Sequence, residues 1–170
     1  KCRRADAVAV THASNVSGIV FPLERLAEIA ARHAVPLIVD ASQTIGSEPI
    51  DCAALKIAAL AGSGHKNLFG VQGCGLLAVG ETARIKPLIF GGTGSLSESA
   101  AMPDYLPDAL ESGTQNTAAI AALAAGVDFI TTIGQETILK RKHQLSDYLR
   151  SELPTINSVR IHGATVGEPR

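Results

Sequence analysis

Short apolar runs, separated by segments long enough for a helix or a tight loop, constrain the fold of this chain most. Each run has the length and the buried character of a strand in a parallel sheet. The first two runs are separated by 22–34, where apolar residues recur at helical spacing behind a proline suited to the first helical position. This order predicts an α/β fold with three layers, in which helices flank a mostly parallel sheet. The predicted strands are 6–12 (DAVAVTH), 36–40 (PLIVD), 57–61 (IAALA) and 75–79 (GLLAV), and a short helix capped by Asp51 is expected at 52–56.

The second half of the chain has a different pattern. Residues 87–115 are rich in Gly, Pro, Ser and Thr, which predicts a long loop, and such loops are usually functional or interfacial. Helices are expected over about 116–133 and 135–153, and 158–163 (SVRIHG) is typical of a strand. In the two helices we expect the following residues to point inward: Ile120, Leu123, Val127 and Ile130, then Ile138, Leu145, Leu149 and Leu153, with Lys140, Arg141 and Lys142 outward.

The ends of the chain add an expectation about its organisation. The chain starts directly at a strand and stops after another has begun, which would leave sheet edges bare. We therefore interpret it as an internal fragment of a larger α/β protein. Residues 1–135 would be part of a major domain, and 136–170 a connecting helix with the start of a small α+β domain.

Composition and charge exclude several function classes. The formal net charge is -1, with 15 basic and 16 acidic residues, so we expect no nucleic-acid partner. The three cysteines are widely spaced, which argues against a disulfide framework and against a zinc site and fits a reducing cytoplasm. The longest mostly apolar window, 118–130, is too short for a membrane span and contains an aspartate.

Polar side chains follow three successive predicted strands, where ligands bind in parallel α/β sheets. Taken one at a time, each is explained better as a cap, a turn residue or a surface group, and His12 as a structural histidine with a satisfied partner. The coincidence of Asp40 and Lys66, each closing a neighbouring strand, favours a functional site. The groups are His12 and Asn15 after the first strand, Asp40 and Gln43 after the second, and Ser63, His65 and Lys66 after the third.

Pyridoxal phosphate is the ligand that needs this combination of groups. Its aldehyde needs a lysine amine to form a Schiff base, which Lys66 would supply. Its ring nitrogen needs a carboxylate to stay protonated, which Asp40 would supply. Its phosphate needs hydroxyls and donors at a glycine-rich turn, and the turn Ser63–Gly64–His65 offers both. The glycine-rich 91–95 (GGTGS) lacks the strand–turn–helix frame of a nucleotide-binding loop, so a nucleotide-binding Rossmann domain is possible by fold but has no motif to support it.

Four segments of the sequence are similar, in order, to motifs of the class V aminotransferases, and most of all to the cysteine desulfurase and selenocysteine lyase branch. The segments are SNVSG, VDASQTIGSEPID, SGHKNLFGVQGCGLLAV and ESGTQNTAAI. The resemblance implies the type I fold of pyridoxal-phosphate enzymes, with 1–135 in the cofactor-binding major domain. It implies that Lys66 carries the cofactor, that Asp40 pairs with the ring nitrogen, and that Gln43 bonds the ring hydroxyl oxygen with Asn15 close by. Ser63 and His65 would hold the phosphate, and Thr114 would reach the phosphate of the partner subunit's cofactor in a homodimer.

The resemblance also implies an activity. The expected reaction converts L-cysteine to L-alanine and leaves persulfide sulfur on a thiolate, with a sulfur-acceptor protein as a possible partner. A class V aminotransferase or a selenocysteine lyase on the same scaffold is the first alternative, and a catalytically incomplete fragment is the second. Val71 replaces a common proline and Ala58 a common acid, at positions that do not touch the cofactor in the family. Cys2, Cys52 and Cys74 do not match the family's sulfur acceptor.

Overall fold

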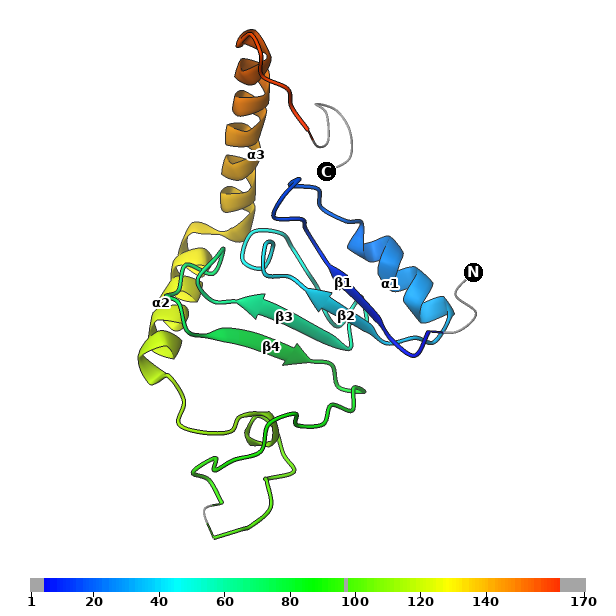
Figure 1. The fold of residues 1–170 in the computed structure, drawn as a ribbon, viewed down its shortest axis with the longest axis vertical. Helices are drawn as coiled ribbons and strands as arrows, with labels where there is room; N and C mark the ends of the chain where they lie inside the picture. The colour runs from blue at the N-terminus through cyan, green and yellow to red at the C-terminus, as the bar shows by residue number, and fades with distance from the viewer. Residues whose placement is uncertain (1–4, 97, 163–170) are drawn as a thin grey trace.

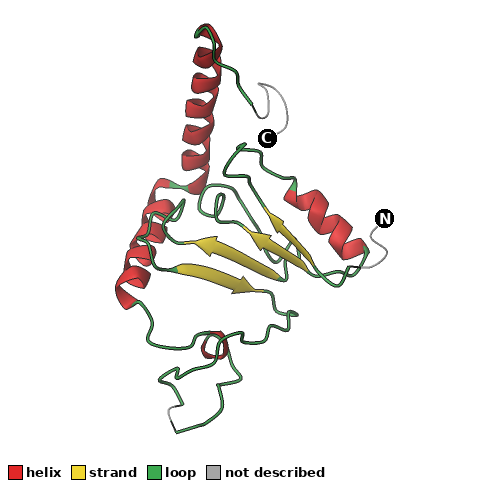
Figure 2. Cartoon of the chain, viewed as in Figure 1, coloured by secondary structure: helices red, strands yellow, loops and turns green. Residues whose placement is uncertain are grey.

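A computed structural model describes residues 5–96 and 98–162, and it shows a four-stranded sheet with three α-helices (Figures 1 and 2). The strand order is β1-β2-β3-β4, in which β1, β2 and β3 run parallel and β4 is antiparallel to β3. The α/β class and the mostly parallel sheet are therefore as predicted. The strands are β1 (Val8–Thr11), β2 (Leu37–Asp40), β3 (Ala59–Ser63) and β4 (Gly75–Val79). The helices are α1 (Leu23–Arg32), α2 (Thr117–Ile133) and α3 (Gln135–Glu152), with 3-10 turns η1 (Asp108–Leu110) and η2 (Leu153–Thr155).

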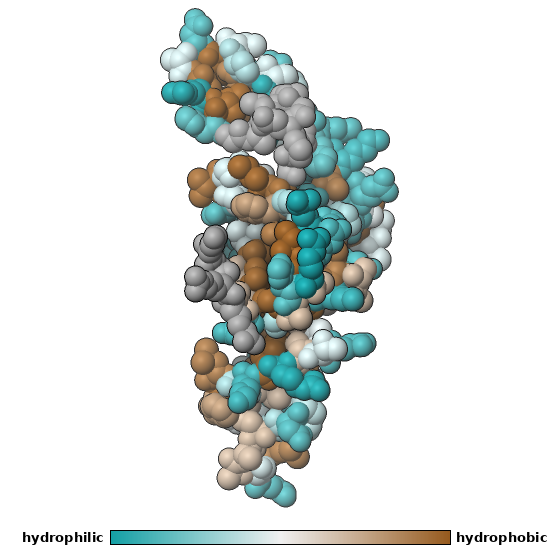
Figure 3. All heavy atoms as spheres, turned by 90° about the vertical axis from the view of Figure 1, so that its right-hand side faces the viewer, coloured by the Kyte–Doolittle hydropathy of each residue, from teal (hydrophilic) through white to brown (hydrophobic). Residues whose placement is uncertain are grey.

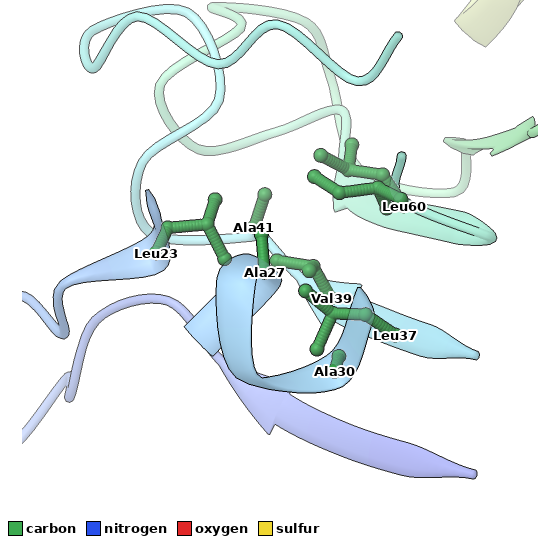
Figure 4. Close-up of a cluster of buried hydrophobic side chains, with 8 residues drawn as sticks. Leu23, Ala27, Ala30, Leu37, Val39, Ala41 and Leu60 are labelled. Carbon is green, nitrogen blue, oxygen red and sulfur yellow. The ribbon is translucent and has the colours of Figure 1, made fainter. Parts of the chain in front are cut away.

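The core lies between α1 and one face of the sheet. Residues at i, i+4 and i+7 of α1 are buried, and they meet alternate residues of β2 because side chains of a strand point to opposite faces in turn. Two of the three helix residues are alanines, so the helix can approach the sheet closely. Figure 4 shows the cluster of Leu23, Ala27, Ala30, Leu37, Val39, Ala41 and Leu60.

The register of the parallel strands brings their carboxyl ends to one edge of the sheet. Thr11 pairs with Asp40, and Asp40 pairs with Ala61. Backbone hydrogen bonds continue this alignment past the strands, from His12 N to Asp40 O (2.9 Å) and from Ala41 N to Ala61 O (2.8 Å). The loops that follow β1, β2 and β3 therefore begin side by side.

Three element predictions need correction. Residues 52–56 form turns and no helix. Asp51 Oδ1 accepts from Ala53 N and Ala54 N, as expected of a cap, but Lys56 adopts a left-handed φ of +52, so the turns do not continue as a helix. The third strand begins two residues later than predicted, at Ala59, because Ile57 N still bonds back to Cys52 O. Residues 158–162 form no strand, and residue 163 lies outside the described residues.

The inward faces of the last two helices also differ from the prediction. In α2 the buried residues are Ala119, Gly126 and Ile130, whereas Ile120 and Val127 are exposed. The helix packs by its small residues because Gly126 lies against the backbone of Leu68 and Phe69.

Helix α3 extends away from the sheet (Figure 1) and has no buried residue in the described part of the chain. Leu145 and Leu149, predicted to point inward, are 51% and 55% exposed. Figure 3 shows apolar surface at the end of the molecule where α3 finishes. Lys142 is exposed overall as predicted, but its ammonium group contacts Ser47.

Cys52 and Cys74 are free thiols. No group of three or more His, Cys, Asp or Glu side chains in the described ranges is placed to hold a metal ion. No single helix there is long and apolar enough to cross a membrane. One pair, α2 with residues 135–155, passes on length and composition but is bent by 83° at its break.

Candidate active site

Apart from Thr114, which precedes α2, the predicted site residues lie at or just after the carboxyl ends of β1, β2 and β3. Asp40 is the last residue of β2, and Ser63 is the last residue of β3. Gln43 follows β2, and His65 and Lys66 occupy the turn that follows β3. The sheet register thus places a carboxylate at the end of β2 beside the strand whose following turn carries the Lys66 amine.

Asp40 is held as a carboxylate. Ser42 N donates to Asp40 Oδ1 over 2.9 Å. Hydrogen bonds from the Ser42 hydroxyl and then its amide lower the pKa of Asp40 below its ordinary value, and the charge of Lys66 lowers it further, while partial burial opposes the shift. Asp40 remains solvent-exposed, so this site is open on one side.

The Lys66 turn is closed by backbone hydrogen bonds at both ends. Gly64 N donates to Cys74 O (3.1 Å), and Gly70 N donates to Gly64 O (2.9 Å), so the turn returns to where it started. A Cβ at Gly64 would lie 2.9 Å from Cys74 O, and one at Gly70 would lie 2.9 Å from Gly64 O. Only glycine allows backbone to approach this closely. Lys66 is therefore presented from a fixed frame.

Helix α2 supports the turn from outside. A Cβ at Gly126 would lie 2.0 Å from Leu68 O, so the helix axis approaches the turn's backbone closely. Phe69 takes a left-handed backbone conformation (φ +57), which is costly for a bulky residue. Its ring meets Phe129 of α2 edge-on, with centroids 5.2 Å apart. These contacts explain why α2 buries its small residues.

Ser63 is connected to Asp40 through Ser42. Its hydroxyl donates to Ser42 Oγ over 3.2 Å, which links the end of β3 to the residue that holds Asp40. His65 is exposed, and Gln43 is half-buried. Hydrogen bonds through Ser42 thus join Asp40 and Ser63, the charge of Lys66 acts on Asp40, and Gln43 lies on the adjoining loop.

Asn15 and Thr114 are not hydrogen-bonded to this group in the described residues. Both are exposed, and within residues 5–96 and 98–162 no hydrogen bond joins either side chain to Asp40 or Lys66. Asn15 lies in a turn organised by Ser14, whose hydroxyl accepts from Val16 N and Ser17 N. Thr114 precedes α2, whose N-cap residue is Asn116.

His12 has the structural character expected of it. It is buried, and its Nδ1 lies 2.9 Å from Thr44 Oγ1. Burial lowers the pKa of His12, while the charges of Glu48 and Glu24 act in the opposite direction. The His12 imidazole thus connects the end of β1 to the loop after β2 through its hydrogen bond with Thr44.

Four residues of the site region were not predicted from sequence. Ser42 stands inside the DASQ motif, and Asn67 stands next to Lys66, so position alone could have suggested them. Ser47 and Lys142 are far apart in sequence, and their contact depends on where α3 lies. A sequence pattern carries no signal for such a contact.

Two hollows lie near the sheet. A groove of about 860 Å³ runs between β3–β4 and residues 106–123, and its lining includes Ser42 and Ser63 but not Asp40 or Lys66. A second hollow of about 600 Å³ lies at the opposite edge, beside Pro36 and Ala58 at the start of β2 and β3. The first of these adjoins the site, and the second does not.

A lysine in the turn after β3, whose charge acts on a carboxylate at the end of the neighbouring parallel strand β2, is the arrangement that this α/β fold places at one edge of its sheet. The chain belongs to the aminotransferase class-V family, whose profile matches residues 2–170. It is 33% identical over 161 residues to a cysteine desulfurase of Escherichia coli (strain SE11), covering 92% of this chain and 39% of that protein. The chain therefore spans about two fifths of the length of the curated relatives it matches.

Solved structures agree with this assignment. The apo cysteine desulfurase of Thermococcus onnurineus NA1 superposes with a TM-score of 0.77 at 27% identity, over 96% of this chain and 45% of that one. A structure described as SspA in complex with cysteine matches with a TM-score of 0.58 at 30% identity, over 71% of this chain and 31% of that one. The predicted class V resemblance is confirmed.

Proposed function

We propose that this chain forms the pyridoxal-phosphate-binding part of a cysteine desulfurase-like enzyme. The observation that carries the proposal is that the charge of Lys66 acts on Asp40 at the neighbouring strand end, where hydrogen bonds from Ser42 keep the carboxylate ionised. The relatives described as cysteine desulfurases, from Escherichia coli and Thermococcus onnurineus NA1, support the choice of L-cysteine as substrate.

The residues present fit the cofactor by their chemistry. A primary amine on a rigid turn would bind an aldehyde carbon, and Lys66 is the lysine in that position. An ionised carboxylate would hold a proton on a pyridine nitrogen, which suits Asp40. Gln43 would bond the ring hydroxyl oxygen. Ser63 and His65, at the start of a glycine turn, would hold the phosphate.

The reaction would depend on proton movements at named atoms. When bound, pyridoxal phosphate supplies an electron sink that stabilises negative charge on the substrate α-carbon. Lys66 Nζ, once released by the incoming amino acid, would take the α-proton and later return it. Asp40 would keep the ring nitrogen protonated throughout, and Ser42 would keep Asp40 ionised. A cysteine thiolate would attack the substrate sulfur, so that an S–S bond forms as the substrate C–S bond breaks, the β-carbon gains a proton, and alanine and a persulfide are left.

A homodimer is the partner arrangement that we propose for Thr114. Large apolar side chains are exposed in the loop that leads to it, including Leu88, Ile89 and Phe90, and Leu88 is 93% exposed. A second copy that covered this loop would bury them, and Thr114 would then face the partner's cofactor phosphate. We propose a reducing compartment such as the cytoplasm, which is consistent with the two free thiols.

The proposal is tested by titrating the chain with pyridoxal phosphate and recording its visible absorption. The unaltered chain and Lys86→Ala, which removes an exposed lysine, should both develop the band of the lysine-bound cofactor. Lys66→Ala should not, and a band that persisted in Lys66→Ala would refute the assignment. With L-cysteine, sulfide or persulfide identifies desulfuration and a keto acid identifies transamination. Cofactor binding with no turnover identifies an incomplete catalytic unit.

A further inference from the structure

Asn67, the neighbour of Lys66, joins two loops that the proposed function requires to be fixed relative to one another. Its side-chain amide nitrogen donates to the backbone carbonyl of Gln43 and to Ser47 Oγ, the latter over 3.3 Å. Gln43 and Ser47 both belong to the loop that follows β2 and Asp40. The side chain therefore bridges the turn that carries Lys66 and the loop that carries Gln43.

A backbone contact reinforces this bridge. Gly46 adopts φ +90, and a Cβ there would lie only 2.5 Å from Asn67 O. The loop after β2 thus lies directly against the backbone of Asn67 as well as its side chain. Two separate contacts fix the same pair of segments.

Ser47 is the acceptor that makes the bridge rigid. It is fully buried, and a hydroxyl offers one donor and two acceptor positions. Its hydroxyl donates to Thr44 O (3.1 Å) and accepts from Asn67 and from Lys142 Nζ (2.8 Å). All its hydrogen-bonding capacity is used, so removing one donor leaves one acceptor position of a buried hydroxyl unfilled.

Two residues of α3, Lys142 and Gln135, contact the loop that follows β2. Burial lowers the pKa of Lys142, and the charge of Glu48 acts in the opposite direction. Gln135 Nε2, at the start of α3, also donates to Glu48 O over 2.8 Å. The loop after β2 is thereby tied to α3 on one side and to the Lys66 turn on the other.

We propose that Asn67 is a positioning residue that sets the distance and direction between Lys66 and Gln43, and so the orientation of the cofactor ring. This inference rests on the proposed function. Asn67 has no part in the chemistry itself, since both its donors face backbone and Ser47. Without it, Lys66 can still capture the cofactor, but the ring is no longer aligned with Gln43.

The test separates capture of the cofactor from its orientation. Capture is measured by borohydride fixation of pyridoxal phosphate and mass spectrometry of the Lys66 peptide. Orientation is measured by the visible circular dichroism that a bound, fixed ring acquires. The variants are Asn67→Ala, the isosteric Asn67→Asp, which has no amide donor, and Asn157→Ala as an exposed control.

Both Asn67 variants should still be labelled at Lys66, with most of the visible circular dichroism lost. Their apparent Kd for pyridoxal phosphate should rise about tenfold, from the loss of two hydrogen bonds. Asn157→Ala should match the unaltered chain. Full visible circular dichroism and unchanged Kd in Asn67→Asp would overturn the inference. Absence of Lys66 labelling in the unaltered chain would instead overturn the proposed function.

A measurement on the unaltered chain guards against variants that fail to fold. The side-chain amide of Asn67 should exchange its hydrogens with solvent many times more slowly than that of Asn157. Equal exchange rates at the two amides would show that Asn67 is not held, and would overturn the inference without any substitution.

Discussion

Replacing Gly126 by alanine has two opposite effects on the stability of the fold. Alanine favours the helix, but its Cβ would clash with the backbone of the Lys66 turn. In a helix interior, alanine is favoured over glycine by about 1 kcal/mol. Here the new Cβ would lie 2.0 Å from the Leu68 carbonyl oxygen, whereas ordinary contact begins near 3.4 Å. The difference, 3.4 minus 2.0, is 1.4 Å, and backbone on both sides must absorb it. Overpacking typically costs about 3 kcal/mol at its upper end, so the net loss of stability should be about 2 kcal/mol.

Urea denaturation measures this loss. With a slope of about 2 kcal/mol/M, the midpoint should fall by about 1 M with the slope unchanged. Gly92→Ala is the matched control, because a Cβ there meets nothing within 4 Å, and its midpoint should stay the same. A Gly126→Ala chain as stable as the unaltered one, or more stable, would refute the close approach of α2 to the Lys66 turn.

Three further predictions concern the edge of the sheet and the core. Ser42→Ala should raise the pKa of Asp40 toward its ordinary value, because the hydroxyl is the main cause of its lowering; a carboxyl NMR titration checks this, and an unchanged pKa would contradict it. The native state disfavours protonated His12, so the free energy of unfolding should fall as pH drops below about 6.5, and His12→Asn should flatten that dependence; an equal slope in denaturation at several pH values would show otherwise. Val39→Ala should cost about 2 kcal/mol in the same denaturation assay, since Val39 is fully buried, and a neutral effect would mean that the core is not packed as described.

The sheet could be predicted because its signals are local. Runs of apolar residues mark the strands, and the polar residue that ends β2, Asp40, is visible in the sequence without any tertiary information. The boundaries of β3 could not be predicted, because Ile57 belongs to the preceding turn through a bond to Cys52 O. The direction of β4 was also undetermined, since an apolar strand has the same pattern whether it runs parallel or antiparallel.

Sequence reasoning identified the site residues whose side chains have a characteristic chemistry, and it missed those that act by contacting another segment. Asp40 and Lys66 have characteristic side chains at characteristic places. Asn67 and Ser47 act by contact with another segment, and such contacts depend on the packed structure. The exposed face of α3 was mispredicted for a related reason, because periodicity identifies an apolar stripe but not what covers it.

The central claim is that Lys66, and no other lysine of this chain, binds pyridoxal phosphate beside Asp40. The most direct measurement is borohydride fixation of the cofactor on the unaltered chain, followed by peptide mass spectrometry. The account predicts a single pyridoxyl group on the peptide that contains Lys66, and loss of most of it in Asp40→Ala at limiting cofactor. Label spread over exposed lysines such as Lys86, or label at Lys66 that is indifferent to Asp40, would contradict it.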